Sequence, residues 1–584
     1  MKFTDSLNRK NIVIAAVVLA AGFVVLGFFA LQRPTRVEME RYAPADALAF
    51  IEVDSLADLV DGFTRTKAWR ELAPVLGLSS QLKQVGPVAD LIGRTGLGPD
   101  EAVVAGRAQL AIAITGLDSE VGQTDEGPYL HLKPRFAVII ETHMKPASAT
   151  RLLELRAPTI AQRIYGESVT EDSEDYQGSK VLIFSGPAPR RQLVASAVGS
   201  AIAMGNDIES IKACLDSIAG RTTSLAKDPT IEQMKSEVGS EPAVFGYLSP
   251  KGIQKLLELS PGLISGRASD SDAASLIADL VEHLSKQAVS GLLYSMSFEA
   301  GGVSEKYLTV LKPQVAEALA EPLKSAPGAS FESLGMIPRE IESLSVLDVE
   351  RAGDFPERVL KHVSPTLDVV AGVALREFVI SFRRQYGLGP TDSIGDAIGT
   401  EIAWVNFGDD QPRAMLVRVQ DKSRLLPAVT KYLVRKGSSV GRDQYNGTEI
   451  LLSSEDNRRA ASFGGNFLVL GTRDQIIRCI DTSMAHDGMD RDERFKHILE
   501  TRPANASLIS YRPRGESAGK LLLAISELTR VTDGSPDLLE GEKARKALDR
   551  LPRSIVTTEF RNYGAYTESH SAVGSLSFIS EIEK

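Results

Sequence analysis

The sequence contains very little cysteine. Among its 584 residues there are only two, Cys214 and Cys479. Two thiols cannot form the disulfide framework of a small secreted domain, and without other ligands they cannot complete a zinc site. We therefore interpret both as small apolar side chains inside a core, and we expect no disulfide between them.

Known catalytic motifs are missing as well. The sequence has no GxxxxGK[ST] phosphate loop, no GxSxG nucleophile turn, no HExxH pair and no EF-hand loop. The histidines do not have the spacing of metal ligands, and they stand at positions 131, 143, 283, 362, 486, 497 and 570. We therefore predict no catalytic residue, no cofactor and no metal site, and we expect that the protein is not an enzyme.

Positive charge is not in excess. The chain carries 66 Lys and Arg against 76 Asp and Glu, which gives a formal net charge of −10. A general nucleic-acid-binding protein needs a basic surface that displaces counterions, so the composition argues against this class. The hydrophobic share of 43% is typical of a folded globular protein, and the length predicts two or more domains.

One long hydrophobic run is present at residues 11–31, with the sequence NIVIAAVVLAAGFVVLGFFAL. About 20 apolar residues in a helix span a hydrocarbon core of roughly 30 Å, so we predict a transmembrane anchor. A cleaved signal peptide is the alternative, but its apolar core is usually shorter and ends at small residues, whereas this run ends in GFFALQRPT. No later segment is apolar enough to predict a second span.

The orientation of this anchor does not follow from the positive-inside rule, because the flanking basic residues are nearly balanced. They are Lys2, Arg9 and Lys10 before the run and Arg33, Arg36 and Arg41 after it. The short tail favours residues 1–10 in the cytoplasm, since a large C-terminal part is translocated largely regardless of its charge. We predict a single-pass protein of the inner (cytoplasmic) membrane, held through residues 11–31, with the bulk of the chain extracytoplasmic.

Two stretches of the chain are nearly alike: MGNDIESIKACLD from Met204 and LGTRDQIIRCID from Leu470, which start 470 − 204 = 266 residues apart. Further matches surround them in the same order, among them YQGSKVLIFSG with YNGTEILLSS and GLGPDEAV with GLGPTDSI. This pattern predicts a duplicated domain rather than a short-period solenoid. We place the first repeat at 32–312, a linker at 313–330 and the second repeat at 331–584.

Each repeat is predicted to contain hairpins and single helices. Asn446-Gly447 is typical of a two-residue turn between strands, and Gly178 stands at the matching place in the first copy. Strands that alternate with single helices predict an α+β fold class. We expect two tandem copies of a mainly antiparallel sheet with helices packed on one face, preceded by one transmembrane helix.

The two similar stretches each predict a strand followed by a capped helix. In the first copy the predicted N-cap is Asn206 with Glu209 three residues on, and in the second it is Thr472 with Gln475. This spacing forms a capping box, in which the cap side chain and the acid or amide each accept a hydrogen bond from a backbone N–H group.

Three further places have a functional alternative beside the structural interpretation. Gly205 precedes a helix N-terminus and could therefore hold a phosphate. The acidic stretch Glu171–Asp175 could bind calcium weakly, but we interpret it as a solvated loop. The glycine-rich segment 93–106 could also bind phosphate, although we interpret it as turns. Trp69 and Trp404 are predicted core residues.

The phrases YAPADALAFIEVDSLADL, DYQGSKVLIFSG and AIAMGNDIESIKACLDSIAGRTTSLAKDP follow a lone N-terminal apolar segment. This combination resembles a bacterial family known only as domain of unknown function 3352. The similarity covers most of the first half and, more loosely, the second. It implies a bacterial envelope protein and assigns no catalytic residue.

Three functional classes remain open. The first is a non-catalytic envelope module, a binding or scaffold protein whose partner is a protein or an envelope polymer. The second is a carrier or chaperone for an apolar ligand such as a lipid or lipoprotein. The third is an enzyme with an unrecognised site. An open apolar cavity would favour the second class, and a pocket that gathers carboxylates would favour the third.

Overall fold

The computed structural model describes residues 36–78, 108–258, 285–385 and 394–576, with short gaps inside these ranges. The predicted cytoplasmic tail 1–10, the predicted transmembrane helix 11–31 and the glycine-rich segment 93–106 lie outside the described residues. Within the described ranges no helix is both long enough and apolar enough to cross a membrane.

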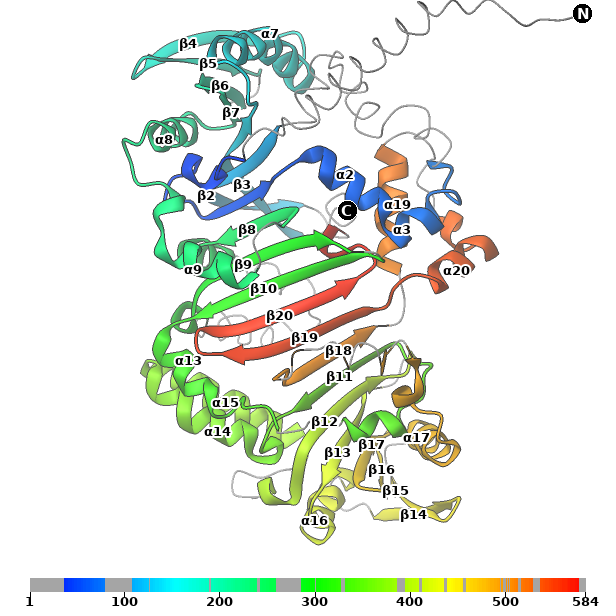
Figure 1. Cartoon of the computed structure of the whole chain (residues 1–584). Coiled ribbons are helices and arrows are strands. Elements are labelled where there is room, and N and C mark those ends of the chain that lie inside the picture. The colour runs from blue at the N-terminus through cyan, green and yellow to red at the C-terminus, as the bar shows by residue number, and fades with distance from the viewer. Residues whose placement is uncertain are drawn as a thin grey trace, which may run out of the picture.

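The strands of the first half of the chain lie next to one another in one half of a large sheet, in which each strand is antiparallel to its neighbours (Figure 1). In spatial order its strands are β4 (Thr170–Tyr176), β5 (Ser179–Ser185), β6 (Gln192–Val198), β7 (Ala201–Gly205), β3 (Gly127–Glu141), β2 (Gln109–Thr124), β1 (Ala49–Val53), β8 (Val244–Leu248), β9 (Val289–Phe298) and β10 (Val303–Leu311).

The second half repeats this order strand for strand. Its strands are β14 (Val440–Tyr445), β15 (Thr448–Ser453), β16 (Ala460–Gly464), β17 (Phe467–Gly471), β13 (Ala414–Val419), β12 (Ile398–Asn406), β11 (Ser343–Asp348), β18 (Leu508–Arg512), β19 (Ser554–Arg561) and β20 (Gly564–Ser571).

The two halves join edge to edge through β10 and β20, so the sheet is a single one of 20 strands. The pairing runs from Val303 opposite Ser571 to Val310 opposite Gly564. The predicted fold class is therefore wrong, because it gave each repeat its own sheet. The last strand of each copy would be an open edge in a separate domain, and here the two edges cover each other.

The predicted placement of helices on one face is also wrong, because helices cover both faces. Side chains alternate between face A, which carries Phe50 and Leu344, and face B, which carries Ile112 and Trp404. Helices α8 and α17 pack on face A, and α7 and α16 pack on face B. Each half thus has a hydrophobic core on either side of its strands.

The helices of the first half are α2 (Leu56–Arg65), α3 (Lys67–Leu72), α7 (Pro146–Tyr165), α8 (Ile208–Ile218), α9 (Pro229–Val238), α10 (Pro250–Glu258), η1 (Met39–Tyr42) and η2 (Leu225–Lys227). Those that follow are α13 (Pro313–Ala320), α14 (Phe355–Val363), α15 (Val369–Gln385), α16 (Lys422–Leu433), α17 (Arg473–Ala485), α19 (Glu516–Leu528), α20 (Glu542–Asp549), η3 (Glu332–Met336), η4 (Ala352–Asp354), η5 (Ser364–Thr366), η6 (Gly395–Ala397), η7 (Met489–Arg491) and η8 (Pro536–Leu539).

The predicted hairpin turns are confirmed in both copies. Asn446 and Gly447 have φ values of 47° and 77°, and the turn residues Gln177 and Gly178 have 55° and 81°. Two consecutive positive φ values are the geometry of the turn that matches the twist of paired strands. These turns therefore fix the registers of β4 with β5 and of β14 with β15.

The capping box is confirmed in the second copy only. There the Thr472 hydroxyl accepts a hydrogen bond from the backbone N–H of Gln475, and the side-chain oxygen of Gln475 accepts one from the backbone N–H of Thr472. In the first copy the N-cap is Asp207, whose carboxylate accepts from the Ser210 N–H at 2.9 Å. Asn206 instead joins the helix to strand β3, because its side chain accepts from the Phe136 N–H and donates to a β3 carbonyl.

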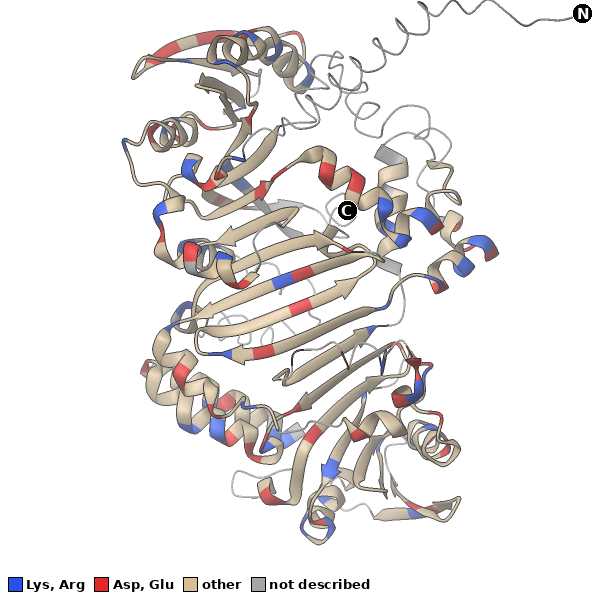
Figure 2. Cartoon of the chain, viewed as in Figure 1, with Lys and Arg blue, Asp and Glu red and all other residues tan. Residues whose placement is uncertain are grey.

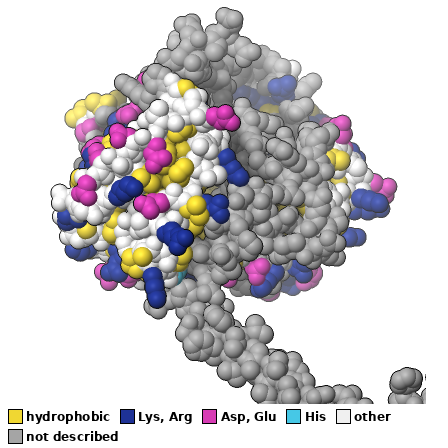
Figure 3. Space-filling view, turned by 90° about the horizontal axis from the view of Figure 1, so that it is seen from above, with side chains coloured by type: hydrophobic (Ala, Val, Ile, Leu, Met, Phe, Trp, Pro, Cys, Tyr) yellow, Lys and Arg dark blue, Asp and Glu magenta, His cyan; other side chains and the backbone are white. Residues whose placement is uncertain are grey.

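The acidic stretch Glu171–Asp175 is not the loop that we predicted. It lies within β4, the strand at one edge of the sheet, where Figure 2 shows a run of acidic positions. Charged side chains on an edge strand discourage further strands from pairing with it, so a structural role accounts for this stretch. Figure 3 views this end from above, and the described surface there mixes charges of both signs with hydrophobic side chains.

The predicted linker at 313–330 contains helix α13, which packs against α14 of the second half. The halves also interlock away from the sheet, since Leu72 of α3 shares a buried cluster with Leu521 of α19 and Ala547 of α20. The chain boundaries that we predicted stay a prediction, but the contacts show two repeats that are packed together rather than strung apart.

Candidate functional site

A large apolar pocket lies on face B of the second half. Its volume is about 590 Å³. Strands β11, β12, β13 and β17 form its floor, and α14, α15 and α16 form its walls. The apolar lining residues are Leu319, Leu323, Leu347, Ala352, Phe355, Pro356, Val359, Leu375, Phe378, Val379, Ile394, Ile398, Ile402, Trp404, Met415, Val417, Leu425, Ala428, Val429, Leu468, Leu470 and Phe560, with Tyr432 beside them.

The way that the chain leaves the sheet explains why this pocket forms. In the first half, β1 ends at Val53 and α2 begins at Leu56, directly after the Ser55 cap. Helix α2 lies so close to face B that the Phe298 ring occupies the space where a side chain of Gly62 would stand. In the second half, β11 ends at Asp348 but α14 begins only at Phe355, after the extra turn η4. The later start lets α14 stand off the sheet.

Charge within the pocket is confined to one ion pair. Among the described lining residues the charged ones are Glu357 of α14 and Arg383 of α15, and their side chains contact each other. Phe378 lines the pocket and is also 55% exposed, so this ring lies at the rim of the pocket. The interior therefore suits the uncharged, apolar part of a ligand.

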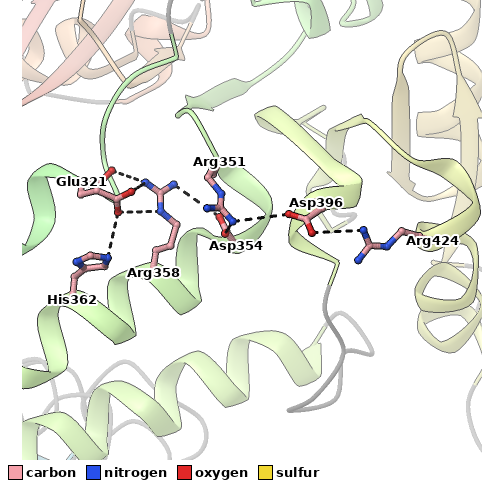
Figure 4. A network of polar contacts seen from close by, with 7 residues as sticks. All are labelled: Glu321, Arg351, Asp354, Arg358, His362, Asp396 and Arg424. Carbon is pink, nitrogen blue, oxygen red and sulfur yellow. Dashed lines mark hydrogen bonds and ion pairs between the residues drawn. The ribbon is translucent and has the colours of Figure 1, made fainter.

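A chain of ion pairs links the segment after α13 with α14, η4, η6 and α16 (Figure 4), and we call it the cover network. Each of its members except His362 is next to, or one residue removed from, a lining residue in the sequence. The members are Glu321, Arg351, Asp354, Arg358, His362, Asp396 and Arg424.

The cover network is tight at one end and loose at the other. The buried Arg358 guanidinium donates to the Glu321 carboxylate at 2.7 and 3.2 Å and to the Glu321 carbonyl at 2.6 Å. These bonds hold the pKa of Glu321 below its usual value. At the other end, Asp396 lies 4.0 Å from Arg351 and 3.7 Å from Arg424.

A second unusual group is a cluster of buried charges in the first half. The carboxylates of Glu40 and Glu52 are buried on face A, and the Lys235 ammonium contacts Glu40 and lies 3.7 Å from Glu52. Burial, together with the charges of Asp54 and Glu38, raises the pKa of Glu52 to about 8. None of the described pockets is lined by these three residues.

The residues that the sequence singled out are not brought together. Both cysteines are free and buried in separate cores, and burial raises the pKa of each thiol to about 12. Among the described histidines, His143 lies near Glu141, His362 belongs to the cover network and His570 contacts two glutamates. The described ranges contain no group of three His, Cys, Asp or Glu residues placed to hold a metal ion.

The glycine before the first similar helix has a structural task. A side chain on Gly205 would meet the Phe136 carbonyl oxygen at 2.1 Å, so the residue permits close approach of β7 to β3. The cap of the following helix is an aspartate, whose negative charge opposes an anion at the same place. These contacts favour the structural interpretation over a phosphate site.

The pocket residues were missed by the sequence reasoning. Their signal lies in residues 369–385, VVAGVALREFVISFRRQ, where apolar residues occupy most positions around the helix. A helix with apolar side chains on more than one side is typical of contacts on two sides. No protein family model, curated protein or solved structure matches the chain, so the resemblance to the envelope family stays a prediction.

Proposed function

We propose that this protein is a non-catalytic binding protein that holds an apolar ligand in the pocket between α14, α15 and α16. The observation that carries the proposal is the pocket itself, about 590 Å³ in volume, with apolar side chains on floor and walls. Ligand-binding cavities commonly have this size and this lining. The proposal selects the carrier class over a catalytic one.

The chemistry of the lining narrows the class of ligand. Glu357 and Arg383 neutralise each other, so neither leaves a net charge in the pocket for an ionic group. Burying an unpaired charge in an apolar cavity costs several kcal/mol, which a ligand carrying that charge inside would have to supply. We therefore propose a ligand whose buried part is a hydrocarbon, such as an acyl chain.

The proposed location rests on the sequence. Residues 11–31 have the length and composition of a membrane anchor, and the remainder of the chain would lie outside the cytoplasm. A protein held at the inner membrane would be next to a supply of acyl chains. This placement in a bacterial envelope is part of the proposal.

The test uses the full chain in membranes. A photoactivatable fatty acid with a clickable tag is added, the sample is irradiated, and crosslinked peptides are identified by mass spectrometry. We expect crosslinks to peptides that contain lining residues of α14, α15 and α16. Crosslinks that are spread evenly over the surface, or absent, would contradict the proposal.

A matched pair of variants sharpens this test. Ala428 lines the pocket and Thr430 lies two residues on in the same helix, exposed to solvent. Ala428→Trp should fill the pocket and reduce crosslinking strongly, whereas Thr430→Trp should leave it unchanged. An equal loss in both variants would show that damage to α16, rather than filling of the pocket, is responsible.

A second candidate function is the binding of a protein partner, the first class that the sequence left open. It is favoured by three exposed valines, Val369, Val370 and Val373, in the first two turns of α15. Crosslinking of the full chain in cells, followed by the variant Val370→Asp, would test it. Loss of a discrete crosslinked complex in this variant would support a partner, and an unchanged pattern would contradict it.

A further inference from the structure

We propose that the cover network is an electrostatic latch, that Asp396 is its weak point, and that access to the pocket is governed there. The purpose of such a latch rests on the proposed ligand-binding function, but its mechanics do not. The latch predicts that the cover opens more often when the two ion pairs of Asp396 are weakened.

The network joins elements that the sheet does not join directly. Arg351 and Asp354 belong to the connection between β11 and α14, and they link to Arg358 of α14. On the opposite side, Arg424 stands in the first turn of α16, whose next residue Leu425 lines the pocket. Asp396 of η6 lies between these two groups and contacts an arginine of each.

The strength of the contacts locates the weak point. The Arg358 guanidinium is buried and makes three hydrogen bonds of 2.6 to 3.2 Å to Glu321. The Asp396 side chain is 70% exposed, and its contacts to Arg351 and Arg424 are long, at 4.0 and 3.7 Å. The contact of Arg358 with Asp354 is as long, at 3.9 Å, but it joins two side chains that are only 8% and 20% exposed. Exposed ion pairs are weak and are screened by salt, whereas a buried, multiply bonded arginine is screened much less.

Backbone contacts beneath the network hold the turns η4 and η6 and the start of α16 together. A side chain on Gly353 would meet the Gly395 carbonyl oxygen at 2.5 Å, so η4 and η6 touch backbone to backbone. The amides of Gln420 and Asp421 donate to the Ala397 carbonyl and tie the start of α16 to η6. Opening therefore requires α16 and α14 to move apart across the pocket rather than the turns to separate.

Thiol labelling reads out this opening without any ligand. The variant Ala428→Cys places a thiol in the pocket lining of the full chain, and Thr430→Cys places one on the exposed side of the same helix. The native cysteines are buried and should not react with a water-soluble maleimide. The ratio of the two labelling rates measures how often the cover opens.

We expect Ala428→Cys to react much more slowly than Thr430→Cys at low salt. In 1 M NaCl, or with Asp396→Asn added, the ratio should rise roughly threefold to tenfold, the effect of weakening two exposed ion pairs. The control Asp443→Asn removes a half-buried aspartate of β14 that pairs with Arg473 of α17 at 2.7 Å, outside the cover network. It should leave the ratio unchanged.

Two results would overturn the latch. One is a ratio of labelling rates that changes neither with salt nor with Asp396→Asn. The other is equal labelling of Ala428→Cys and Thr430→Cys at low salt. Either result leaves the proposed ligand binding to be judged by the crosslinking experiment, because labelling needs no ligand. Conversely, a salt-sensitive ratio without fatty-acid crosslinks would keep the latch and reject the ligand.

Discussion

The first and second halves of this chain have the same strand order, yet the helices and side chains that pack against those strands differ. On face B, α2 of the first half rests on the sheet at Gly62, whereas α14 of the second half stands off and leaves the pocket. On face A, the first half buries Glu40 and Glu52, whereas the second half has Leu334 and Val346 at the matching places. Val346 matches Glu52 by strand register, because Phe50 opposite Tyr247 corresponds to Leu344 opposite Tyr511. Leu334 matches Glu40, because each stands four residues before a proline that forms the same isolated bridge, Pro338 to Gly488 and Pro44 to Ser224.

This comparison separates the needs of the fold from those of one copy. Features that occur in both copies, such as the paired turns and the buried cysteines, belong to the fold that the two repeats share. The pocket and the cluster of Glu40, Glu52 and Lys235 occur in one described half each, so the shared topology does not demand them. They are the places where a role specific to one half is to be sought.

The largest effect should come from the buried charges. Lys235→Leu removes the cation that faces the buried carboxylates of Glu40 and Glu52. An uncompensated buried charge costs about 3 kcal/mol or more of folding free energy, so the urea midpoint should fall clearly. The combined variant Glu40→Leu, Glu52→Val and Lys235→Leu copies Leu334 and Val346 of the second half, removes all three charges and should recover most of this loss. A combined variant as unstable as Lys235→Leu would show that the charges are needed together.

The next effect concerns the contact that closes the first half. A side chain on Gly62 would meet the Phe298 ring at 2.1 Å, and the Cγ atom at the base of this ring would lie only 2.6 Å away. Gly62→Ala should therefore cost about 2 kcal/mol by overpacking, measured by chemical denaturation. Pro356→Ala, at the pocket wall of the second half, removes atoms beside open space and should cost less. The reverse order would contradict our account of why only α14 stands off.

Helix caps give a smaller and more equal effect. Asp207→Ala and Thr472→Ala each remove the side chain that accepts from the third helical N–H, and each should cost about 1 kcal/mol. Asn206→Ala should not act through the helix end, since this residue bonds to β3. Amide hydrogen exchange separates the cases: the Ser210 N–H should lose protection in Asp207→Ala, and the Phe136 N–H in Asn206→Ala. The opposite assignment would restore Asn206 as the cap.

The cap residues also show how far the sequence could predict this fold. Thr472 and Gln475 form the predicted box because the residue next to Thr472 is Arg473, whose side chain cannot accept a hydrogen bond from a helical N–H. Asn206 and Asp207 can both cap a helix, and strand β3 takes the first of them. Local spacing could not decide this, because the deciding partner is 70 residues away.

Neither the strand pairing between the halves nor the pocket could be predicted from the sequence, and the reason is related. The pairing of β10 with β20 connects strands of different repeats, and the residue pattern of a strand does not identify the strand that pairs with it. The pocket depends on how far α14 stands from the sheet, which is set by the extra turn η4. Periodicity predicts which side of a helix is buried, but not how closely it approaches.

One polar contact is the same in both halves and should have the same small effect in each. Tyr176 donates to Asp216 at 2.9 Å, and Tyr445 donates to Asp481 at 3.1 Å, each tying a hairpin to the helix that follows. Tyr176→Phe and Tyr445→Phe should each lower the urea midpoint slightly and by a similar amount, because each removes one hydrogen bond near the surface. Denaturation of both variants side by side checks this. A much larger loss in one half would show that the pair has a role beyond the repeat.

The two cysteines should behave alike, with no measurable reaction in the folded chain. Both are buried, and burial raises each thiol pKa to about 12, so the reactive thiolate is scarce near pH 8. A thiol reagent added to the full chain at pH 8 should label neither residue until denaturant is present, and then both together. Mass spectrometry of the oxidised protein should find no link between Cys214 and Cys479. Both lie on face A, but Cys214 belongs to the core of the first half and Cys479 to that of the second. Selective labelling of one cysteine in the folded state would mean that its half opens independently. The shared sheet would then join two units of unequal stability, and the half that opens would be the one to examine for ligand exchange.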